Sequence, residues 1–548
     1  MSYLSLFTFF MFVLVTSDNL VQLFLGWEGI GLCSYLLISF WNTRVQANKA
    51  ALKAIVMNRV GDFGYLCGLI LVYYFFRSVD FSIIFIVAPF FTDATFSFLF
   101  WDVACLDAIC LCLFIGSVGK SAQMGFHTWL PDAMEGPTPV SALIHAATLV
   151  TAGVFLIVRC SPLFEFSPLV LFVILILGGL TAFFAATVAV AQNDIKKVIA
   201  YSTCSQLGYM VFICGLSYYN LSMFHLINHA FFKALLFLSA GSVIHAMSGE
   251  QDVRKYGQLV NFIPYTYSSM LIGSIALAGL PFLSGFYSKD LILEIAFSSY
   301  TVGGFFVYWL GTLSAGLTAF YSFRAVYLTF WGENMSFKYY VQNIHELPWN
   351  MGFSLFILVV GSVFSGYFLK DLFVGVGSTF WGNSIFILSK NSSHFDCEFI
   401  SLFFKNLPLI LSIFNIFIAL VLNKLFFSYS NSLDGLIVKG FILRKNEEFF
   451  KNKLLFWTIK ILWFLNNKWY FDYIYNYYIG FSVLKHSYET FYKLIDKGFI
   501  EICGIQGLSS ITYKIALILS YQKLGYIYHS ASLLIFSMCL CLCILIAI

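Results

Sequence analysis

Runs of about 20 apolar residues recur from one end of this chain to the other, and this pattern leaves few folds open to it. A run of that length spans a lipid bilayer as a helix, because a helix satisfies its own backbone hydrogen bonds where water is absent. Of the 548 residues, 60% are hydrophobic and 11% are charged, whereas a soluble domain carries about 25% charged residues. The sequence therefore predicts an all-α, polytopic membrane protein. We expect about thirteen spans, near residues 3–24, 25–41, 54–76, 102–123, 140–159, 168–190, 199–217, 221–246, 265–288, 303–323, 351–370, 403–427 and 529–548.

Several classes of site are not indicated by the sequence. The 13 cysteines include no CxxC pair, so we expect no zinc or iron–sulfur ligand set and interpret them as small buried apolar residues. There is no GxGxxG and no Walker A pattern, and the net charge of +4 gives no indication of nucleic acid. The start of the chain has no basic region and no small-residue cleavage site, so we expect no cleavable signal peptide. We therefore expect no cofactor and no metal on this chain.

Residues 428–528 differ in composition from the rest of the chain. They are rich in Lys and Tyr and contain no clean apolar run of 20 residues. Leu454–Leu465 is short for a span and is flanked by Lys453 and Lys468, which favours an amphipathic segment at the membrane interface. A disordered loop is the alternative, and the density of aromatic residues argues against it.

Three titratable residues lie inside one apolar run, at His225, His229 and Lys233. Their spacing of i, i+4 and i+8 places them along one stripe of a helix. An ionisable residue at the bilayer centre costs about 2.5–3.5 kcal/mol on insertion scales. A single lysine near a helix end often extends its amine to the interface, but a stripe of three such residues favours a path for protons or ions.

Two apolar segments are interrupted by glycine and proline. The first interruption follows Lys120 and contains Pro131, Pro137 and Pro139, and the second contains Pro281 and precedes Lys289. Interrupted helices at matching positions of two halves are typical of inverted-repeat transporters. Five predicted spans separate the two, so the pattern predicts two inverted five-helix repeats.

Further charged residues lie in other apolar segments: Glu28, Arg59, Asp62, His145 and Asp290. Glu28 is flanked by glycines that allow close helix packing, and Lys120 is its candidate partner. Arg59 and Asp62 are three residues apart and can pair on one helix face. For this pair a structural and a functional role are equally supported by the sequence.

A set of motifs runs through these positions. They are Gly26-Trp-Glu-Gly-Ile-Gly31, Gly119-Lys-Ser-Ala-Gln123, His127-Thr-Trp-Leu-Pro-Asp-Ala-Met-Glu-Gly-Pro-Thr-Pro-Val-Ser-Ala142, Asn193-Asp-Ile-Lys-Lys197, Ser205-Gln-Leu-Gly208, His229-Ala-Phe-Phe-Lys-Ala234 and Gly285-Phe-Tyr-Ser-Lys-Asp290. Over essentially its whole length the chain resembles the chain 5 family of NADH–ubiquinone oxidoreductase, the distal antiporter-like subunits of respiratory complex I. Gly498–Gly507 also resembles the plant and protist mitochondrial versions.

This resemblance implies roles for individual residues. Glu28 and Lys120 form a pair, His145 follows the first helix break, Lys233 is the central lysine with His225 and His229 beside it, and Lys289 is the terminal lysine. Arg59, Asp62 and Asp290 support them. NADH, FMN, iron–sulfur clusters and ubiquinone are implied on other subunits, and the location implied is the mitochondrial inner membrane.

The resemblance also implies an organisation along the chain. This is a first span at 1–24, antiporter-like repeats at 25–160 and 161–330, additional spans at 331–427, a lateral interfacial arm at 428–528 and an anchor span at 529–548. The arm is implied to contact neighbouring antiporter-like subunits. The family has about three further spans ahead of the first one, and we expect a separate chain as one source of them.

The predicted function is that of a proton-translocating membrane subunit of complex I, driven by electron transfer on other subunits. One alternative is the large subunit of a multi-subunit cation/proton antiporter, which shares these motifs. Another is a structural antiporter-like scaffold, although a scaffold gains nothing from buried charges.

Overall fold

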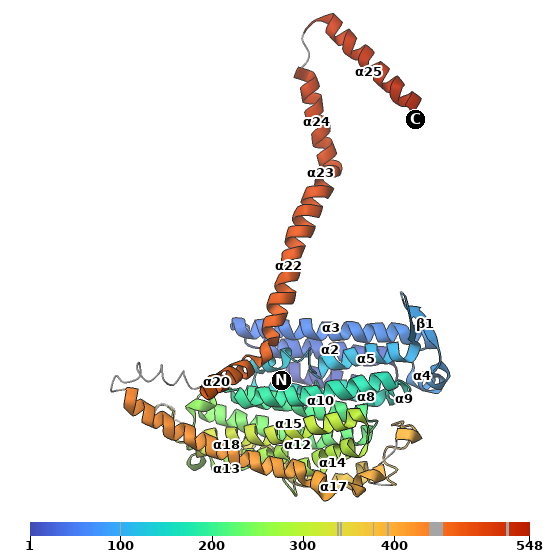
Figure 1. The fold of residues 1–548 in the computed structure, drawn as a ribbon. Coiled ribbons are helices and arrows are strands. Elements are labelled where there is room, and N and C mark those ends of the chain that lie inside the picture. The colour runs from blue at the N-terminus through green and yellow to red at the C-terminus, as the bar shows by residue number, and fades with distance from the viewer. Residues whose placement is uncertain are drawn as a thin grey trace. The chain divides into compact units, whose positions relative to one another are not determined.

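A computed structural model describes the chain except residues 99, 337–338, 340–341, 343, 376, 392–393, 438–452, 522–524 and 548. For 145–146, 394–396, 425–437, 453–459 and 547 it describes the backbone and not the side chains. The chain forms two compact units, Met1–Trp469 and Tyr470–Ile548. Long helices of the first unit lie side by side, as Figure 1 shows.

The first unit contains most of the apolar segments as helices. Its long helices are α1 (Ser2–Val15), α2 (Leu20–Ile38), α3 (Val45–Phe76), α5 (Cys105–Lys120), α10 (Pro168–Ala191), α11 (Ile195–Gly215), α12 (Tyr219–Ala246), α13 (Pro264–Ala278), α14 (Ser284–Ser298), α15 (Val302–Val326), α17 (Trp349–Phe373), α18 (Leu402–Ile437) and α20 (Lys453–Asn466). Short elements between them are α4 (Phe81–Val87), η1 (Ala88–Phe91), α6 (Trp129–Asp132), η2 (Ala133–Glu135), α7 (Thr138–Val140), η3 (Ser141–Thr148), α8 (Thr151–Arg159), α9 (Ser161–Phe164), η4 (Val253–Lys255), η5 (Leu259–Asn261), η6 (Tyr327–Trp331), η7 (Ser389–Asn391) and η8 (His394–Phe399).

Among the described residues, nine helices are long and apolar enough to cross a membrane, or ten if a bent pair near the C-terminus counts as one span. Each of the other four predicted spans is interrupted or short in the structure. The membrane-spanning helical fold predicted from the sequence is confirmed, while the described residues contain fewer full-length spans than the thirteen or so predicted.

The first of these differences is at the N-terminus. The sequence predicts spans at 3–24 and 25–41, but α1 ends at Val15 and α2 begins at Leu20. The side chain of Asn19 accepts a hydrogen bond from the Gln22 amide at 2.6 Å and caps α2. The polar residues Thr16–Asn19 thus separate the two helices, earlier in the chain than the predicted boundary.

The second break divides one predicted span, 265–288, into two helices. α13 ends in a left-handed Gly279, whose amide donates to Ile275 and Ala276, and Pro281 lies in the gap before α14. α14 then continues to Ser298, beyond the predicted end of the span. The interruption predicted around Pro281 is thus present, and it separates α13 from α14.

A two-stranded antiparallel sheet precedes α5. β1 (Thr95–Phe98) pairs with β2 (Trp101–Ala104) so that Thr95 faces Ala104 and Phe98 faces Trp101. The predicted span at 102–123 is therefore shortened at its start, and α5 has 16 residues.

Helices of the first unit approach closely at glycines. A Cβ on Gly61 of α3 would lie 3.0 Å from the Cα of Gly119 in α5, and the reverse distance is the same. Small residues let helix backbones approach in this way. The contact places the C-terminal end of α5, and with it Lys120, directly against α3.

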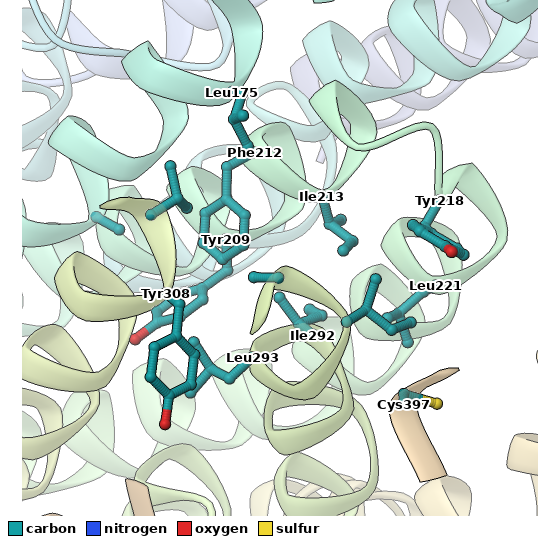
Figure 2. Packing of buried hydrophobic residues seen from close by; sticks show 14 of the residues in the cluster. Leu175, Tyr209, Phe212, Ile213, Tyr218, Leu221, Ile292, Leu293, Tyr308 and Cys397 are labelled. Carbon is teal, nitrogen blue, oxygen red and sulfur yellow. The ribbon is translucent and has the colours of Figure 1, made fainter. Parts of the chain in front are cut away.

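A core of buried side chains joins α10, α11, α12, α14 and α15. Figure 2 shows Tyr209 and Phe212 of α11 with Leu293 of α14 and Tyr308 of α15 in this core. The hydroxyl of Tyr209 donates to the Gly311 carbonyl at 2.6 Å. This core surrounds the charged side chains of α12 and α14 with apolar material.

The second unit is helical. It comprises α21 (Phe471–Tyr473), η10 (Ile474–Phe481), α22 (Ser482–His486), η11 (Ser487–Ile500), α23 (Glu501–Cys503), α24 (Ile505–Tyr521) and α25 (Ile527–Ala547). Up to Cys503 these segments follow one another without a break, and the helix bends by 49° at Gly504. The predicted interfacial arm is thus a long helix, and the part of the prediction at 438–452 lies outside the described residues.

Candidate functional site

Trp27 of α2 organises the polar residues of the first half. Its ring nitrogen donates to Asp62 Oδ1 at 2.7 Å, and its backbone carbonyl accepts from Lys120 Nζ at 3.2 Å. The Lys120 amine also lies 5.6 Å from the centre of the Trp27 ring, within cation–π distance. Lys120 is 2% exposed and Asp62 is 4% exposed. A buried cation and a buried carboxylate therefore both contact one tryptophan.

Glu28 pairs with Arg59 in this structure. Arg59 Nη1 lies 2.6 Å from Glu28 Oε1. Two expected pairings are therefore replaced: the Glu28–Lys120 pair and the Arg59–Asp62 pair are not formed as direct ion pairs. The Glu28 side chain lies at the more exposed edge of α2 beside Arg59, while Trp27 occupies the space next to Lys120.

Short helical fragments follow Lys120. Pro131 lies in α6, Pro137 directly precedes α7 and Pro139 lies within α7. Polar side chains fix this region: Trp129 Nε1 donates to the Gly119 carbonyl at 3.1 Å, and Lys196 Nζ donates to the Gly136 carbonyl at 3.2 Å. His145 lies in the π-helical stretch η3, and its side chain is outside the described part of the chain.

In the second half, His225 is held between two neighbouring helices. Its Nδ1 lies 2.9 Å from Ser288 Oγ of α14, and its Nε2 lies 3.2 Å from Gln206 Oε1 of α11. His225 is fully buried. Because the Gln206 oxygen only accepts, Nε2 carries the hydrogen in this arrangement and Nδ1 accepts from the Ser288 hydroxyl, so His225 is held as one neutral tautomer whose Nδ1 can take up a proton.

His229 and Lys233 continue the stripe along α12. Both are fully buried. Among the described residues, neither ring nitrogen of His229 has a hydrogen-bond partner. Lys233 Nζ donates to Ser202 Oγ at 2.5 Å, and no described carboxylate lies within ion-pair distance of it. The central lysine is therefore held by a hydroxyl and not by a counter-charge.

Lys289 lies at the start of α14, just after the second helix break. Its amine donates to Thr318 Oγ1 at 2.8 Å and lies 5.5 Å from the centre of the Tyr209 ring. The neighbouring Asp290 is partly buried. Lys289 therefore has a hydroxyl and an aromatic face as partners, as Lys120 has a carbonyl and an aromatic face.

The sequence analysis did not identify the uncharged partners of these residues: Ser202, Gln206, Ser288 and Thr318. One signal for them is present, since α11 carries the polar run Tyr201–Gln206 within a span. Among the described residues, no group of three His, Cys, Asp or Glu side chains could hold a metal ion.

Two interrupted helices and buried lysines along their path define an antiporter-like membrane protein. Residues 17–318 match the family described as NADH:quinone oxidoreductase/Mrp antiporter, transmembrane part. The chain is 52% identical to NADH-ubiquinone oxidoreductase chain 5 of Marchantia polymorpha over 96% of its own length and 77% of that protein. It is 53% identical to the protein of the same name from Chondrus crispus, over 98% of its own length and 79% of that protein. The chain belongs to the NADH-ubiquinone oxidoreductase chain 5 family.

Solved structures share the fold. A chain in the Mrp complex from Dietzia sp. DQ12-45-1b superposes with a TM-score of 0.64 at 25% identity, over 80% of this chain and 48% of that one. A chain of an archaeal membrane-bound sulfane sulfur reductase superposes with a TM-score of 0.59 at 23% identity, over 66% of this chain and 58% of that one. The second likeness concerns the fold alone.

Three predictions from the sequence are confirmed by these comparisons. They are the chain 5 family, the antiporter-like fold, and the function of a proton-translocating membrane subunit of respiratory complex I, which makes the chain part of an H⁺-translocating oxidoreductase. The chain is a multi-pass membrane protein that has other membrane subunits as partners. The roles of the individual residues and the domain boundaries stay predictions.

Proposed function

We propose that protons cross this subunit through Lys120, His145, His225, His229, Lys233 and Lys289, with Glu28, Arg59, Asp62 and Asp290 setting the charge around them. The observation that carries the proposal is His229. It lies one helical turn from both His225 and Lys233, in the buried interior, with both ring nitrogens unpartnered among the described residues. A buried polar group is normally hydrogen-bonded, and an unpaired one costs about 1–3 kcal/mol. A fixed structural role does not explain such a residue.

Buried water supplies the missing partners in this proposal. Three unpartnered polar atoms besides those of His229 belong to helices that pack around α12 or next to them: Gln206 Nε2, Ser284 Oγ and the Tyr321 hydroxyl. A buried water needs about 2–4 polar partners, and these groups are the ones we propose for waters in this interior. A water between His229 and Lys233 spans the helical turn that separates them and lets a proton pass.

The charge of Lys233 makes the path responsive to its neighbours. A buried ammonium without a counter-charge is costly, and interacting sites titrate as a coupled set. A proton that arrives at one of the lysines therefore disfavours the proton on the next. A change of charge in the neighbouring subunit then shifts the protonation of the lysines along this subunit.

Within the complex, NADH, FMN, iron–sulfur clusters and ubiquinone belong to other subunits, and this chain contributes the membrane path. We place the subunit in the mitochondrial inner membrane, where the amphipathic arm contacts neighbouring antiporter-like subunits. Residues 25–160 and 161–330 are the two inverted repeats of the path. The amphipathic character of the arm and the two interrupted helices support this assignment.

The test is Lys233→Met in the assembled complex. Reconstituted into vesicles, the variant complex is expected to oxidise NADH with fewer protons moved per NADH than wild type, because the methionine keeps the volume and loses the proton. Lys49→Met is the control, since Lys49 is exposed on α3. An unchanged proton-to-NADH ratio for Lys233→Met would refute the proposed path.

A cation/proton antiporter is the second candidate, and the likeness to a chain of the Mrp complex favours it. Native gels of mildly solubilised membranes distinguish the two. We expect this chain in a large band that stains for NADH oxidation. A smaller band without NADH oxidation, together with Na⁺-dependent proton exchange in vesicles, would support the antiporter instead.

A further inference from the structure

Asp132 is the meeting point of three distant parts of the chain. It lies in α6, between Lys120 and η3, and both of its carboxylate oxygens are occupied. Lys53 of α3 lies 2.6 Å from Oδ2, and Lys468, just after α20, lies 3.2 Å from Oδ1. Each of the three side chains is less than a third exposed. Partial burial and two partners make this site stronger than an isolated surface ion pair.

A second contact joins the same two regions. The ring of Trp469 packs edge-on against Phe184 of α10, with centroids 5.1 Å apart. Phe184 in turn packs edge-on against His127, 4.5 Å away, and His127 lies five residues before Asp132. Both Phe184 and His127 are 2% exposed. Lys468 and Trp469 are called the arm root here. Lys468 contacts the first helix break through the ion pair with Asp132, and Trp469 reaches it through the edge-on rings of Phe184 and His127.

The backbone of the arm root has a defined and costly shape. Lys468, Trp469 and Tyr470 have φ angles of 56°, 55° and 59°, in the left-handed region. This conformation costs about 1–2 kcal/mol per residue for L-amino acids, so it persists where surrounding contacts impose it. The ion pair and the Trp469 ring are such contacts. They fix the point at which the chain leaves the first unit.

Side-chain contacts of this kind hold the fragments of the first helix break in position. Between Lys120 and Ser141 the backbone forms only short helical fragments, so no continuous ladder of hydrogen bonds sets their positions. Trp129 and Lys196 tie the fragments from inside the first unit, and Asp132 ties them to α3 and to the arm root. Lys120 and His145 lie at the two ends of this stretch.

We infer that the arm root is a positioning site for proton transfer: Lys468 and Trp469, acting through Asp132 and Phe184, hold the helix fragments that follow Lys120 in the positions that proton transfer through the first half requires. The inference rests on the proposed proton path and extends it to residues that do not carry protons. Rates of proton transfer fall steeply with distance, and a misplacement of about 1 Å can cost about 10²-fold. Asp132 is a positioning residue in this scheme and not a proton carrier.

The test measures protons moved per NADH oxidised in vesicles that contain the assembled complex. Lys468→Met is expected to lower this ratio while the remaining complex still oxidises NADH, and Lys468→Arg is expected to restore it. Asp132→Asn combined with Lys468→Met is expected to be no worse than Asp132→Asn alone, because Asp132→Asn already removes the contact with Lys468. Lys49→Met, which alters an exposed lysine one turn from Lys53 on α3, is expected to leave the ratio unchanged.

A purely structural role of the contact between the arm root and Asp132 gives a different result. It would lower the amount of assembled complex and leave the proton-to-NADH ratio of the complex that remains at the wild-type value, and this outcome overturns the inference. If Lys468→Met fails to assemble at all, Trp469→Phe keeps the ring and Trp469→Leu removes it, and the same ratio is compared between these two. Lys233→Met is measured in the same experiment. If Lys233→Met lowers the proton-to-NADH ratio and the arm-root variants leave it unchanged, only the inference about the arm root is refuted. If neither lowers the ratio, the proposed proton path is refuted as well.

Discussion

The two halves of the first unit hold their buried lysines in different ways. In the first half Lys120 lies beside Trp27, with Asp62 on the other side of that ring and the Glu28–Arg59 pair next to it, so two cations and two carboxylates balance. In the second half Lys233 and Lys289 donate to the hydroxyls of Ser202 and Thr318, and Asp290 is the carboxylate nearest in sequence. In the first set the cations and carboxylates are equal in number. In the second set the lysines and histidines outnumber the carboxylates.

The difference has a physical consequence. A balanced set is stable with all of its members ionised, and removal of one member leaves a buried charge uncompensated. An unbalanced set tolerates replacement of a lysine by an apolar residue but depends on mobile protons and water for its charge state. We therefore expect the first half to respond to substitution mainly through stability, and the second half mainly through proton transfer.

The largest effect is expected for His229→Leu. This change removes the unpartnered imidazole between His225 and Lys233, so proton transfer along α12 should slow by about 10²–10⁴-fold. Stability should be unchanged or higher, because two unsatisfied buried nitrogens are removed. Proton movement driven by NADH in vesicles measures the first effect, and the amount of complex on a native gel measures the second. His245→Leu, on the exposed end of the same helix, is the matched control. Full proton movement in the His229 variant would contradict the division between the halves.

The next effect is on stability and concerns Lys120→Met. Without the amine, Asp62 loses a neighbouring cation and the Trp27 carbonyl loses its donor, at a cost of about 1–3 kcal/mol. Lys233→Met should cost less, because no described carboxylate loses an ion-pair partner. Thermal unfolding of the two purified variant complexes compares them directly. Adding Asp62→Asn to Lys120→Met should recover part of the loss, and equal stability of the two lysine variants would show that the halves do not differ.

A smaller effect is expected for Ser202→Ala. The hydroxyl of Ser202 accepts a hydrogen bond from Lys233 at 2.5 Å, and one hydrogen bond of this kind contributes about 1–1.5 kcal/mol. Since about 1.4 kcal/mol corresponds to a factor of ten in rate, proton transfer should slow roughly tenfold. Ser205→Ala, one turn further along α11, serves as the control, since its hydroxyl bonds to its own helix. The comparison uses single-turnover proton uptake, and equal rates for the two alanine variants would remove Ser202 from the path.

The smallest effect is expected outside the membrane-spanning helices, at Glu250. A hydrogen bond from Lys255 holds the pKa of the Glu250 carboxyl below its ordinary value of 4.5. The carboxylate therefore stabilises its loop above about pH 4.5, and this contribution is lost as the pH falls through the lowered pKa. As the Lys255 side chain is 48% exposed, the pair is screened by solvent, so Glu250→Gln should cost at most about 1 kcal/mol and leave proton movement unchanged. Amide hydrogen exchange at Gln251 and Asp252, whose backbone amides donate to Glu250, measures the loop. Altered proton movement in this variant would show that residues outside the buried lysine and histidine sites of the two halves also affect proton transfer.

Much of this protein follows from its sequence because the membrane limits the choices. Apolar runs of span length fix the helical class, and the glycine and proline clusters at 131–139 and 279–285 mark the two places where helices break. The polar residues that interrupt these runs also identify where chemistry is concentrated, since an ionisable group in lipid is costly without a role. One boundary was misplaced: the polar residues Thr16–Asn19 separate α1 from α2, and Asn19 caps α2.

The partners of each charge were decided by the tertiary structure. Sequence spacing places Arg59 and Asp62 on one helix, but in the packed helices α2, α3 and α5 Arg59 pairs with Glu28, and Asp62 accepts from Trp27. Lys233 and Ser202 are 31 residues apart, and Lys468 and Asp132 are 336 residues apart, distances at which no local pattern acts. By itself the sequence determined that this chain is a bundle of membrane helices with buried lysines and histidines, because hydropathy and the cost of burying charge are local properties. Which acceptor each buried lysine reaches depends on how helices far apart in the chain pack, and only the folded structure decides it.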